Sequence, residues 1–508
     1  MPMDSKMEES SSPTAADHPD LQRAGSSHSH TARMTESESP LYPKQQQNKG
    51  PSFKAVGFLP IAISRMMKPQ KKIGKSPTYM SSLRAIVFAS WLNVLLVFIP
   101  IGWALHYTMP HNYVAVFITT FIAIIPLAKL LGFATEELAL RVGQTIGGLL
   151  NATFGNAVEL IVAIVALIKC EIRVVQSSLI GSILSNLLLV LGMCFFAGGT
   201  RYSEQGFMAS AAQLNSSLLT ISVIAVLLPA AFHFAVDTNT DPDEGYDILH
   251  MSHGVAIVLL LIYACYLFFQ LWSHAHLYDE GEHAGEAAAS TAYPMGGRTL
   301  KGIAMSAIGK KRPTDAESQP EPHNLEAEEE VEEPQLNVVS AVGLLVLVTV
   351  LVAFTAEFLV DSIDGLTETG GISKEFVGLI LLPIVGNAAE HVTAVTVSVK
   401  DKLDLSIGVA VGSSIQIALF VIPLLVIIAW GLDKPLTMLN DPFESVVLFL
   451  SVLVVNYVVS DGKSNWLEGM ILMMLYVIVA VSFWYYPGSD PLAALGSAAQ
   501  KCAGASSG

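Results

Sequence analysis

The sequence has few charged residues for its length: Asp, Glu, Lys and Arg together make up 14% of its 508 residues. Hydrophobic residues make up 52%, and the mean hydropathy is +0.51. Soluble domains carry charge on about a quarter of their positions, so this composition excludes an ordinary soluble protein and indicates a polytopic protein of the lipid bilayer. The formal net charge of −16 provides no excess of basic surface for phosphate groups, and we expect no nucleic acid partner.

The sequence also lacks the motifs of ATP-driven pumps and of common hydrolases. It contains no Gly-x-x-x-x-Gly-Lys-Ser/Thr phosphate loop, no phosphorylatable aspartate motif of a pump and no His-Glu-x-x-His zinc motif. No pair of residues resembles a nucleophile with its base. These absences favour a secondary transporter over a pump, and they indicate that the protein is not an enzyme.

Cysteine is scarce, and the spacing of the four residues indicates neither a disulfide framework nor a zinc site. We therefore expect packing thiols at Cys170, Cys194, Cys265 and Cys502. The first apolar run of span length begins near Ala85, too deep in the chain for a secretory signal peptide. Residues 1–83 are rich in Ser, Pro, Gln, Lys and His, and we expect a largely disordered tail. The last part of the tail, from Arg65 to Arg84, forms a basic collar that includes Lys68, Lys71, Lys72 and Lys75.

Long apolar runs are frequent in the rest of the chain. A spanning helix needs about 20 mainly apolar residues. Eleven segments meet this requirement: 85–107, 112–134, 147–168, 176–198, 211–234, 250–272, 338–362, 376–399, 404–430, 443–460 and 466–486. We therefore predict an all-α polytopic membrane protein with eleven transmembrane helices.

The distribution of Lys and Arg predicts the orientation of these helices. With the tail and its basic collar in the cytosol, the cytosolic loops hold Arg141, Arg201, Lys400, Lys402 and Lys463, and the loop 273–337 adds five more basic residues. The opposite loops hold Lys169, Arg173, Lys374 and Lys434. The bias agrees with a cytosolic N-terminus.

One pentapeptide occurs twice, each time inside an apolar segment. Gly155-Asn156-Ala157-Val158-Glu159 returns 231 residues later as Gly386-Asn387-Ala388-Ala389-Glu390, and the same offset relates Gly181-Ser182 to Gly412-Ser413. A carboxylate inside a membrane helix is unfavourable by roughly 2.5–3.5 kcal/mol on insertion scales, so such residues usually have a function. After the first span, five spans precede the loop 273–337 and five follow it. Two units with an odd number of spans have opposite orientations, as in the inverted repeats of many secondary transporters.

The repeated residues are suited to bind a divalent cation. Asn156 and Glu159 share one helix face, and Gly155 loosens the helix just before them, so that backbone carbonyls can turn toward the site. Carboxylate, amide and backbone oxygens are the ligands that calcium prefers. The second half repeats this set with Gly386, Asn387 and Glu390. The pattern predicts one cation site formed by both halves.

The next helix of each half adds polar side chains: Ser182, Ser185 and Asn186 in the first, Ser413 and Gln416 in the second. They either support the site or serve only helix packing through hydrogen bonds, and both interpretations stay open. His391 follows Glu390 and is a proton acceptor, a partner that restrains Glu390, or a polar group at the edge of an aqueous cavity. Calcium and protons compete for the same carboxylate oxygens. A pH gradient, worth about 1.36 kcal/mol per proton and pH unit, can therefore drive exchange.

The stretches Gly155–Leu160, Gly181–Leu187, Gly386–His391 and Gly412–Ile417 resemble the two α-repeats of the cation/proton exchangers. These exchangers are a branch of the calcium/cation antiporter superfamily, and the resemblance is closest to the fungal vacuolar calcium/proton exchangers. It covers most of residues 85–486. It implies two inverted five-helix repeats preceded by one extra helix, and transport of cytosolic calcium into an acidic vacuole in return for protons. It implies no cofactor, only the transported calcium, with manganese as a further candidate, and protons.

The resemblance also implies roles and boundaries. Glu159 and Glu390 would be central ligands and proton carriers, Asn156 and Asn387 neighbouring ligands, and His391 the adjacent histidine of the second repeat. The expected parts are a cytosolic tail 1–83, an extra helix 84–110, the repeats 111–272 and 338–487, a cytosolic linker 273–337 and a short tail 488–508.

The family has an acidic segment between its halves, which matches Glu326, Glu328, Glu329, Glu330, Glu332 and Glu333. This run is either a cytosolic calcium-collecting or gating element or a solvated charge run. Glu136, Glu357 and Asp361 near span ends either pass ions inward or cap helices. We group them with the acidic run as a cytosolic set for regulation and ion uptake.

Two rival transport functions stay open. One is exchange driven by sodium or potassium in place of protons. The other is a calcium-permeable channel, in which carboxylates form a ring around a continuous pore. Two glutamates in inverted repeats suit alternating access better than a pore. The sequence leaves the oligomeric state open.

Overall fold

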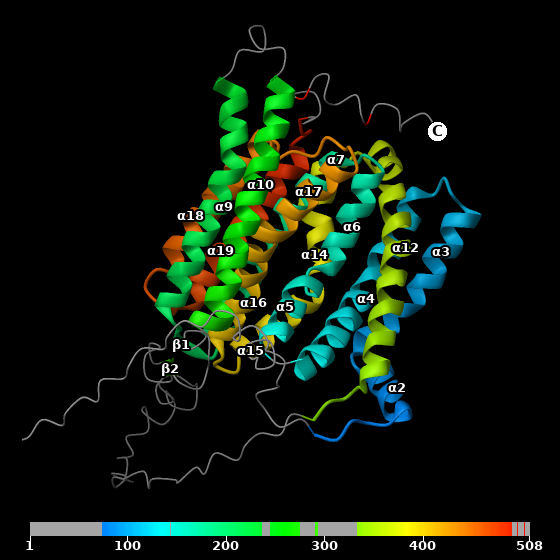
Figure 1. Cartoon of the computed structure of the whole chain (residues 1–508), viewed down its shortest axis with the longest axis vertical. Helices are drawn as coiled ribbons and strands as arrows, with labels where there is room; N and C mark the ends of the chain where they lie inside the picture. Colours follow the sequence, from blue (N-terminus) through cyan, green and yellow to red (C-terminus); the bar gives the residue numbers. More distant parts are fainter. Residues whose placement is uncertain are drawn as a thin grey trace, which may run out of the picture. The chain divides into compact units, whose positions relative to one another are not determined.

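A computed structural model describes residues 74–142, 144–235, 244–274, 290–292 and 333–489, together with Leu495 and Cys502 (Figure 1). The predicted tail up to residue 73 lies outside the described residues, as do Glu326, Glu328, Glu329, Glu330 and Glu332 of the acidic run. Among the described residues, the first helix begins at Tyr79.

The part before the linker is helical almost throughout. Its elements are α2 (Tyr79–Phe88), η1 (Trp91–Val97), α3 (Phe98–Thr108), α4 (Tyr113–Val142), α5 (Gln144–Phe154), α6 (Ala157–Ile168), α7 (Ile172–Leu184), η2 (Ser185–Val190), α8 (Leu191–Gly199), β1 (Tyr202–Gly206), α9 (Ala209–Ala235), α10 (Glu244–Phe268) and η3 (Phe269–Ser273). Here η1 is a 3₁₀-helix, and η2 and η3 are π-helices that continue the α-helices before them.

The second part has a similar order of elements. They are β2 (Thr291–Ala292) within the linker, then α12 (Val338–Gly370), α13 (Lys374–Phe376), η5 (Val377–Leu381), α14 (Leu382–Gly386), α15 (Ala388–Ser398), α16 (Leu403–Gln416), η6 (Ile417–Val421), α17 (Ile422–Gly431), α18 (Pro442–Val458), β3 (Lys463–Ser464) and α19 (Trp466–Tyr485). Both η5 and η6 are π-helices.

Capping residues explain where several helices begin and end. The side chain of Asn337 accepts a hydrogen bond from the Ser340 N–H at 2.8 Å and starts α12. That helix ends before Gly371, whose φ of +65° is the left-handed conformation that glycine adopts most readily. Asn465 and Glu468 form a capping box at the start of α19. The polar residues at these positions therefore place the ends of the apolar helices.

The all-helical prediction is confirmed, while the number of long helices is smaller than eleven. Among the described residues, eight helices are long and apolar enough to cross a membrane, and a ninth span results if Lys374–Gly386 and Ala388–Ser398, bent by 58°, are counted together. The predicted segments 147–168 and 443–460 contain the shorter apolar helices α6 and α18. The first of these is short because the chain breaks after α5.

The loops that hold Arg201, Lys400 and Lys463 were predicted to lie on the same side of the membrane, and they contact each other in the structure. We call the end of the helices from which the linker leaves the linker side. There β1 pairs with β2 of the linker and with β3 in a small antiparallel sheet of order β2-β1-β3, the only departure from helix among the described residues apart from loops. Gln205 of β1 donates to the carbonyl of Ser398, next to Lys400. On the opposite side Lys374 pairs with Glu171 at 2.9 Å, and Lys434 lies 3.1 Å from Cys170 Sγ.

The most buried helical runs lie at matching places in the two halves. In the run Ile172–Gly199, 83% of the most apolar 18-residue stretch is buried. In the run Leu403–Gly431, 72% of the corresponding stretch is buried. Each run changes from α- to π-helix near its middle, at Ser185 in the first and at Ile417 in the second. The wider turn is uncommon and is found mostly at functional sites. These two runs form the centre of the helix bundle.

Two cysteines form a disulfide, so the prediction of four packing thiols is wrong for Cys170 and Cys502. Their Cα atoms lie 5.8 Å apart although 332 residues separate them in the sequence. Sequence spacing indicates only local frameworks, whereas here the fold brings the turn after α6 to the C-terminal segment. Cys194 is buried and Cys265 exposed, and both are free thiols.

Described residues near the C-terminus contact several elements on the side opposite the linker. The Tyr486 hydroxyl donates to Asp441 at 2.8 Å. Burial and this carboxylate raise the pKa of the Tyr486 phenol above its ordinary value, which keeps the proton on the donor. Further along, Leu495 packs in a small apolar cluster with Ala230, Ile248 and Leu439. The disulfide fixes Cys502 to the turn between α6 and α7.

We expect thiol labelling to reveal this disulfide. Denatured but unreduced protein should react with two maleimides per chain and reduced protein with four, because only Cys194 and Cys265 are free. The variant Cys502→Ser should react with three without reduction. Intact-mass measurement after labelling checks the numbers, and four labels without reduction would contradict the pairing.

Candidate functional site

The chain breaks at both repeated Gly-Asn pairs, where the sequence predicted only a helix that glycine loosens. Between α5 and α6, Asn156 has φ −103° and ψ 22°; between α14 and α15, Asn387 has φ −93° and ψ 1°. The carbonyls of these asparagines accept the first hydrogen bonds of the new helices, from Leu160 at 3.0 Å and from His391 at 2.9 Å. A Cβ on Gly155 would lie 2.5 Å from the Asn151 carbonyl oxygen, so the turn requires glycine there.

Glu159 and Glu390 lie in the first turns of the helices that start at the breaks. A negative charge is favourable at this place, because the N-terminus of a helix carries a partial positive charge. Each carboxylate also lies beside the glycine of the other half. A Cβ on Gly386 would lie 2.7 Å from Glu159 Oε1, and one on Gly155 would lie 3.9 Å from Glu390 Oε1. The two breaks therefore interlock, and the two carboxylates are close enough for their charges to interact.

A hydrogen-bond network connects polar side chains of both halves next to this pair. Asn156 Nδ2 donates to Gln416 Oε1 at 2.7 Å, and its Oδ1 accepts from Ser413 Oγ at 3.1 Å. Asn186 Nδ2 donates in turn to Ser413 Oγ at 3.2 Å. The amide of Asn156 is thus fixed from two directions, by residues of α16. The structure brings Asn186, Ser413 and Gln416 together with the Gly-Asn breaks, as a support for Asn156.

The corresponding side chains of the other half have no such partners. In the part of the chain that the structure describes, five buried polar atoms around the breaks form no hydrogen bond: Glu159 Oε2, Glu390 Oε2, Ser185 Oγ, Asn387 Nδ2 and His391 Nε2. Buried polar groups are nearly always paired, so a group of unpaired ones points to a missing ligand, water or proton. The shorter Ser185 replaces Gln416 at the matching position, which explains why Asn387 is not held as Asn156 is.

A small cavity borders Glu159. It has a volume of about 30 Å³, and its lining includes Glu159, Ser182 and Gly386. A space of this size holds one water molecule or one bare ion. Ser182, one of the predicted supporting residues, lies at this cavity, and Ser178 at the cavity wall is a polar residue that the repeat pattern did not indicate.

The two glutamates supply the acidic ligands on their own. The described residues contain no cluster of three or more His, Cys, Asp or Glu arranged to hold a metal ion. A cation at the breaks would therefore complete its coordination with amide, hydroxyl and backbone oxygens. Such a set of neutral oxygens around two carboxylates matches the preference of calcium for six to eight oxygen ligands.

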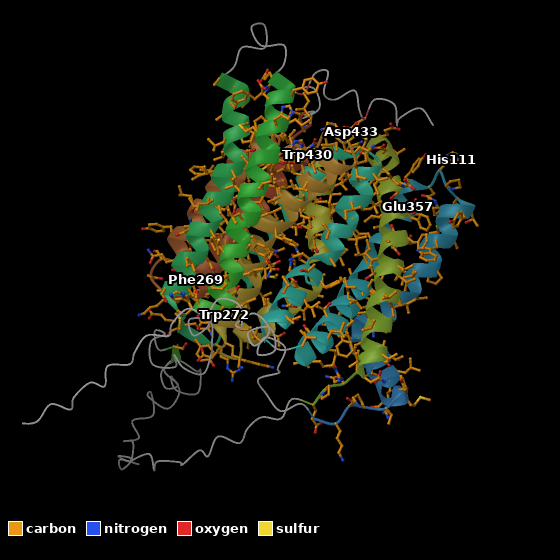
Figure 2. All side chains as sticks on the ribbon, in the orientation of Figure 1. His111, Phe269, Trp272, Glu357, Trp430 and Asp433 are labelled. Carbon is orange, nitrogen blue, oxygen red and sulfur yellow. A yellow bond between two sulfur atoms is a disulfide. The ribbon has the colours of Figure 1, made fainter. Side chains whose placement is uncertain are left out.

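The remaining acidic residues of the prediction do not share one side. Glu136 of α4 lies near enough to Glu390 for their charges to interact. Glu357 and Asp361, by contrast, pair with Lys169 at the far end of α6, opposite the linker side (Figure 2). Grouping them with Glu136 and the acidic run is wrong, because α12 leaves the linker at Val338 and reaches these residues only in its second half.

Glu137, which directly follows Glu136 in α4, has a definite contact. Its carboxylate, 4% exposed, accepts hydrogen bonds from the backbone N–H groups of Gln335 and Leu336, both at 3.0 Å. It therefore fixes the end of the linker to α4. Glu333, the last residue of the acidic run, lies at this junction. A carboxylate directly after Glu136 was visible in the sequence, while its partner residues were not.

Comparison with known proteins identifies relatives over most of the chain. The family model described as sodium/calcium exchanger protein matches residues 112–272 and 340–485. A vacuolar calcium ion transporter from Cryptococcus neoformans var. grubii is 56% identical over 491 residues, which cover 87% of this chain and 81% of the relative. A Ca²⁺/H⁺ antiporter from Synechocystis is 44% identical over 394 residues, covering 78% of this chain and 97% of the relative. The crystal structure of the Ca²⁺/H⁺ antiporter protein YfkE is 30% identical and covers 77% of this chain and 99% of its own, with a TM-score of 0.57.

Proposed function

Because the chain belongs to the sodium/calcium exchanger protein family, we propose that it is a secondary active antiporter that moves cytosolic calcium into an acidic vacuole in exchange for protons. Its relatives support this function, since they carry the names vacuolar calcium ion transporter and Ca²⁺/H⁺ antiporter. The observation that carries the proposal is the placement of Glu159 and Glu390, each against the glycine at the other half's helix break. The relatives are transporters, and we propose no enzymatic activity.

Calcium is the cargo in this cycle, and the two carboxylates are its charged ligands. The oxygens of Asn156 and Asn387 and the backbone at Gly155 and Gly386 complete the site. When calcium leaves, two carboxylates this close together cannot both stay charged in a desolvated place. Protons therefore replace the ion on oxygens that have no other partner. The site holds calcium or protons but not both, which makes the exchange obligatory. His391 beside Glu390 is a further position for a proton.

The two halves contribute unequally to the site. Asn156 is held by Gln416 and Ser413, whereas Asn387 has an unpaired amide. We propose that the first half forms the preorganised part of the site and that Asn387 reorients as calcium binds. Manganese is a further substrate that the same oxygen ligands can accept.

We place the linker side in the cytosol. It carries Arg141, Arg201 and Lys400 of the basic loops, in agreement with the positive-inside rule. The opposite side carries the disulfide Cys170–Cys502, and disulfides form in oxidising compartments such as organelle lumens. Both observations support a cytosolic N-terminus and a multi-pass protein of the vacuolar membrane.

We also propose eleven spans in two inverted repeats, 111–272 and 338–487. This number results if the broken pairs α5–α6 and α14–α15 each count as one span and α18 is included. The interlocked breaks support the inversion, because α6 leads from its break to the side opposite the linker and α15 leads back to the linker side. The Glu333 end of the acidic run and Glu136 then face the cytosol, where they can attract calcium.

Flux into vesicles tests the proposed function. Purified protein in liposomes should accumulate calcium when the interior is acidic, and uptake should stop when an ionophore collapses the pH gradient. Sodium or potassium gradients of the same size should drive no uptake; if they do, the coupling ion is different. Uptake that continues without any gradient, at the rate of a pore, would contradict an antiporter and favour a channel.

A further inference from the structure

A cleft of about 570 Å³ lies on the linker side, where the segment before the first span meets the end of the linker. One wall comes from α2 and the residues before it, with Lys75, Ser81, Arg84 and Phe88. The other wall is the segment 333–335. These walls are about 250 residues apart in the sequence, and the cleft is separate from the ion site at the helix breaks.

Specific contacts hold the two walls in place. Glu137 and Arg141 of α4 bind the linker end, through the backbone N–H groups and the carbonyl of Leu336 respectively. Arg141 also donates to Ser76 Oγ at 3.3 Å, and the Asn337 N–H donates to Ser82 Oγ at 3.0 Å. Since α4 contacts both walls, the cleft is part of the fold and not a gap between loose segments.

The cleft has an excess of positive charge. Lys75 and Arg84 form no ion pair with another described residue, and Glu333 is the single acidic residue of the lining. The sequence directly before the cleft adds the rest of the basic collar, Lys68, Lys71 and Lys72. Basic clusters next to a transmembrane helix on the cytosolic side attract anionic lipids, by about 1 kcal/mol per Lys or Arg.

The helix that forms this wall is also strongly apolar on its outside. Phe88 lines the cleft and is 77% exposed, and Met80 is exposed to a similar extent. Leu83 and Val87 lie on the same helix with more than half of their surface exposed. Apolar side chains thus lie on both sides of Arg84 along α2, so this wall offers a cationic group and an apolar surface together, as the headgroup and the acyl chains of a phospholipid require.

We propose that this cleft binds an anionic phospholipid of the cytosolic leaflet. Lys75, Arg84 and the Ser81 hydroxyl contact its phosphate, and the acyl chains lie against Phe88 and the outer face of α2. The phosphate supplies the counter-charge that the two cations lack among the described residues, and it lies next to Glu333, the last residue of the acidic run. This site goes beyond the proposed ion exchange and does not depend on which ions are carried.

Binding of short-chain lipids to the full-length protein in detergent tests the proposal. Dioctanoyl phosphatidylinositol phosphate should bind the wild type, and the double variant Lys75→Ala/Arg84→Ala should bind it at least 10-fold more weakly. The matched control Lys400→Ala/Lys463→Ala removes two cations from the same side and should bind like the wild type. Dioctanoyl phosphatidylcholine should bind none of the three. Equal binding by the double variant and the control would overturn the site.

Two further arms identify the occupant. If free inositol phosphate binds as tightly as the lipid, the cleft is a soluble-phosphate site and the lipid proposal is wrong. If the lipid binds only after Glu326, Glu328, Glu329, Glu330, Glu332 and Glu333 are replaced with Gln, the cleft is occupied by the chain's own acidic run instead.

Should the double variant fail to fold, the single exposed change Lys75→Gln serves in its place, with an expected loss of lipid affinity of about 3-fold against Lys400→Gln. Flux in vesicles of phosphatidylcholine alone should be equal in the wild type, the Lys75 and Arg84 variants and the Lys400 and Lys463 controls, which separates this test from that of the proposed function.

Discussion

Replacing Glu159 or Glu390 with Gln should reduce calcium uptake into acidic vesicles by about 100-fold or more and leave the fold intact. Gln has the shape of Glu but neither its charge nor its ability to take up a proton. Loss of an outer partner of a metal ligand already lowers affinity or activity by about 10–100-fold, and here a ligand itself is lost. Because each carboxylate lies beside the other half's glycine, neither can replace the other. The initial rate of calcium-45 uptake under a fixed pH gradient measures the effect.

The control for this pair is Glu204→Gln. Glu204 is an exposed carboxylate that pairs with Lys463 at 3.2 Å, and a surface pair of this kind contributes little to stability. Its variant should transport within about 2-fold of the wild type. Size-exclusion profiles should be the same for all variants, since Gln has nearly the volume of Glu and the changes at Glu159 and Glu390 remove carboxylates whose Oε2 atoms have no hydrogen-bond partner among the described residues. The proposal fails if the double variant Glu159→Gln/Glu390→Gln still shows uptake that depends on the pH gradient.

The sequence predicted the centre of the site well, because the chemistry and the repeat coincide there. A Gly-Asn pair followed by a glutamate inside an apolar run predicted a loosened helix with a carboxylate inside the membrane segment, and the structure has a full break at each pair. Both breaks and both unpaired carboxylates are present. What could not be predicted is that each carboxylate lies against the opposite break, because helix periodicity specifies a face of one helix and not the crossing of two.

The predictions that the structure corrects failed for a physical reason of the same kind. Glu357 and Asp361 were grouped with Glu136 because each lies near the end of a span, although the spans run in opposite directions. The pairing of Cys170 with Cys502 depends on where the C-terminal segment runs, and no local pattern contains that information. The π-helices at Ser185 and Ile417 do not differ from α-helices in composition. In all three cases the missing information is tertiary contact.

Replacing Gly181 or Gly412 with alanine should give the second large effect, a change in the stability of the protein. The two glycines occupy equivalent positions in the repeat, but their surroundings differ. The change Gly181→Ala should destabilise the protein by about 3 kcal/mol or more, the upper part of the range for overpacked cores. A Cβ at this position would lie 2.2 Å from the Leu379 carbonyl oxygen and 2.6 Å from its Cα. These are backbone atoms of η5, which packs directly on α7, so no side chain can move away to relieve the contact.

The matched variant Gly412→Ala should change the stability of the protein in the opposite direction. Nothing lies within 4 Å of a Cβ at Gly412, and alanine is more favourable than glycine inside a helix by about 0.5–1 kcal/mol. The melting temperature in detergent, followed by fluorescence-detected size exclusion, should therefore fall sharply for the first variant and stay equal or rise for the second. Calcium transport should follow the same order, because the crossing of α7 with η5 also positions Ser182 and the cavity beside Glu159. Equal melting temperatures of the two variants would mean that the two halves pack alike at this position, and that α7 and η5 do not approach as closely as described here.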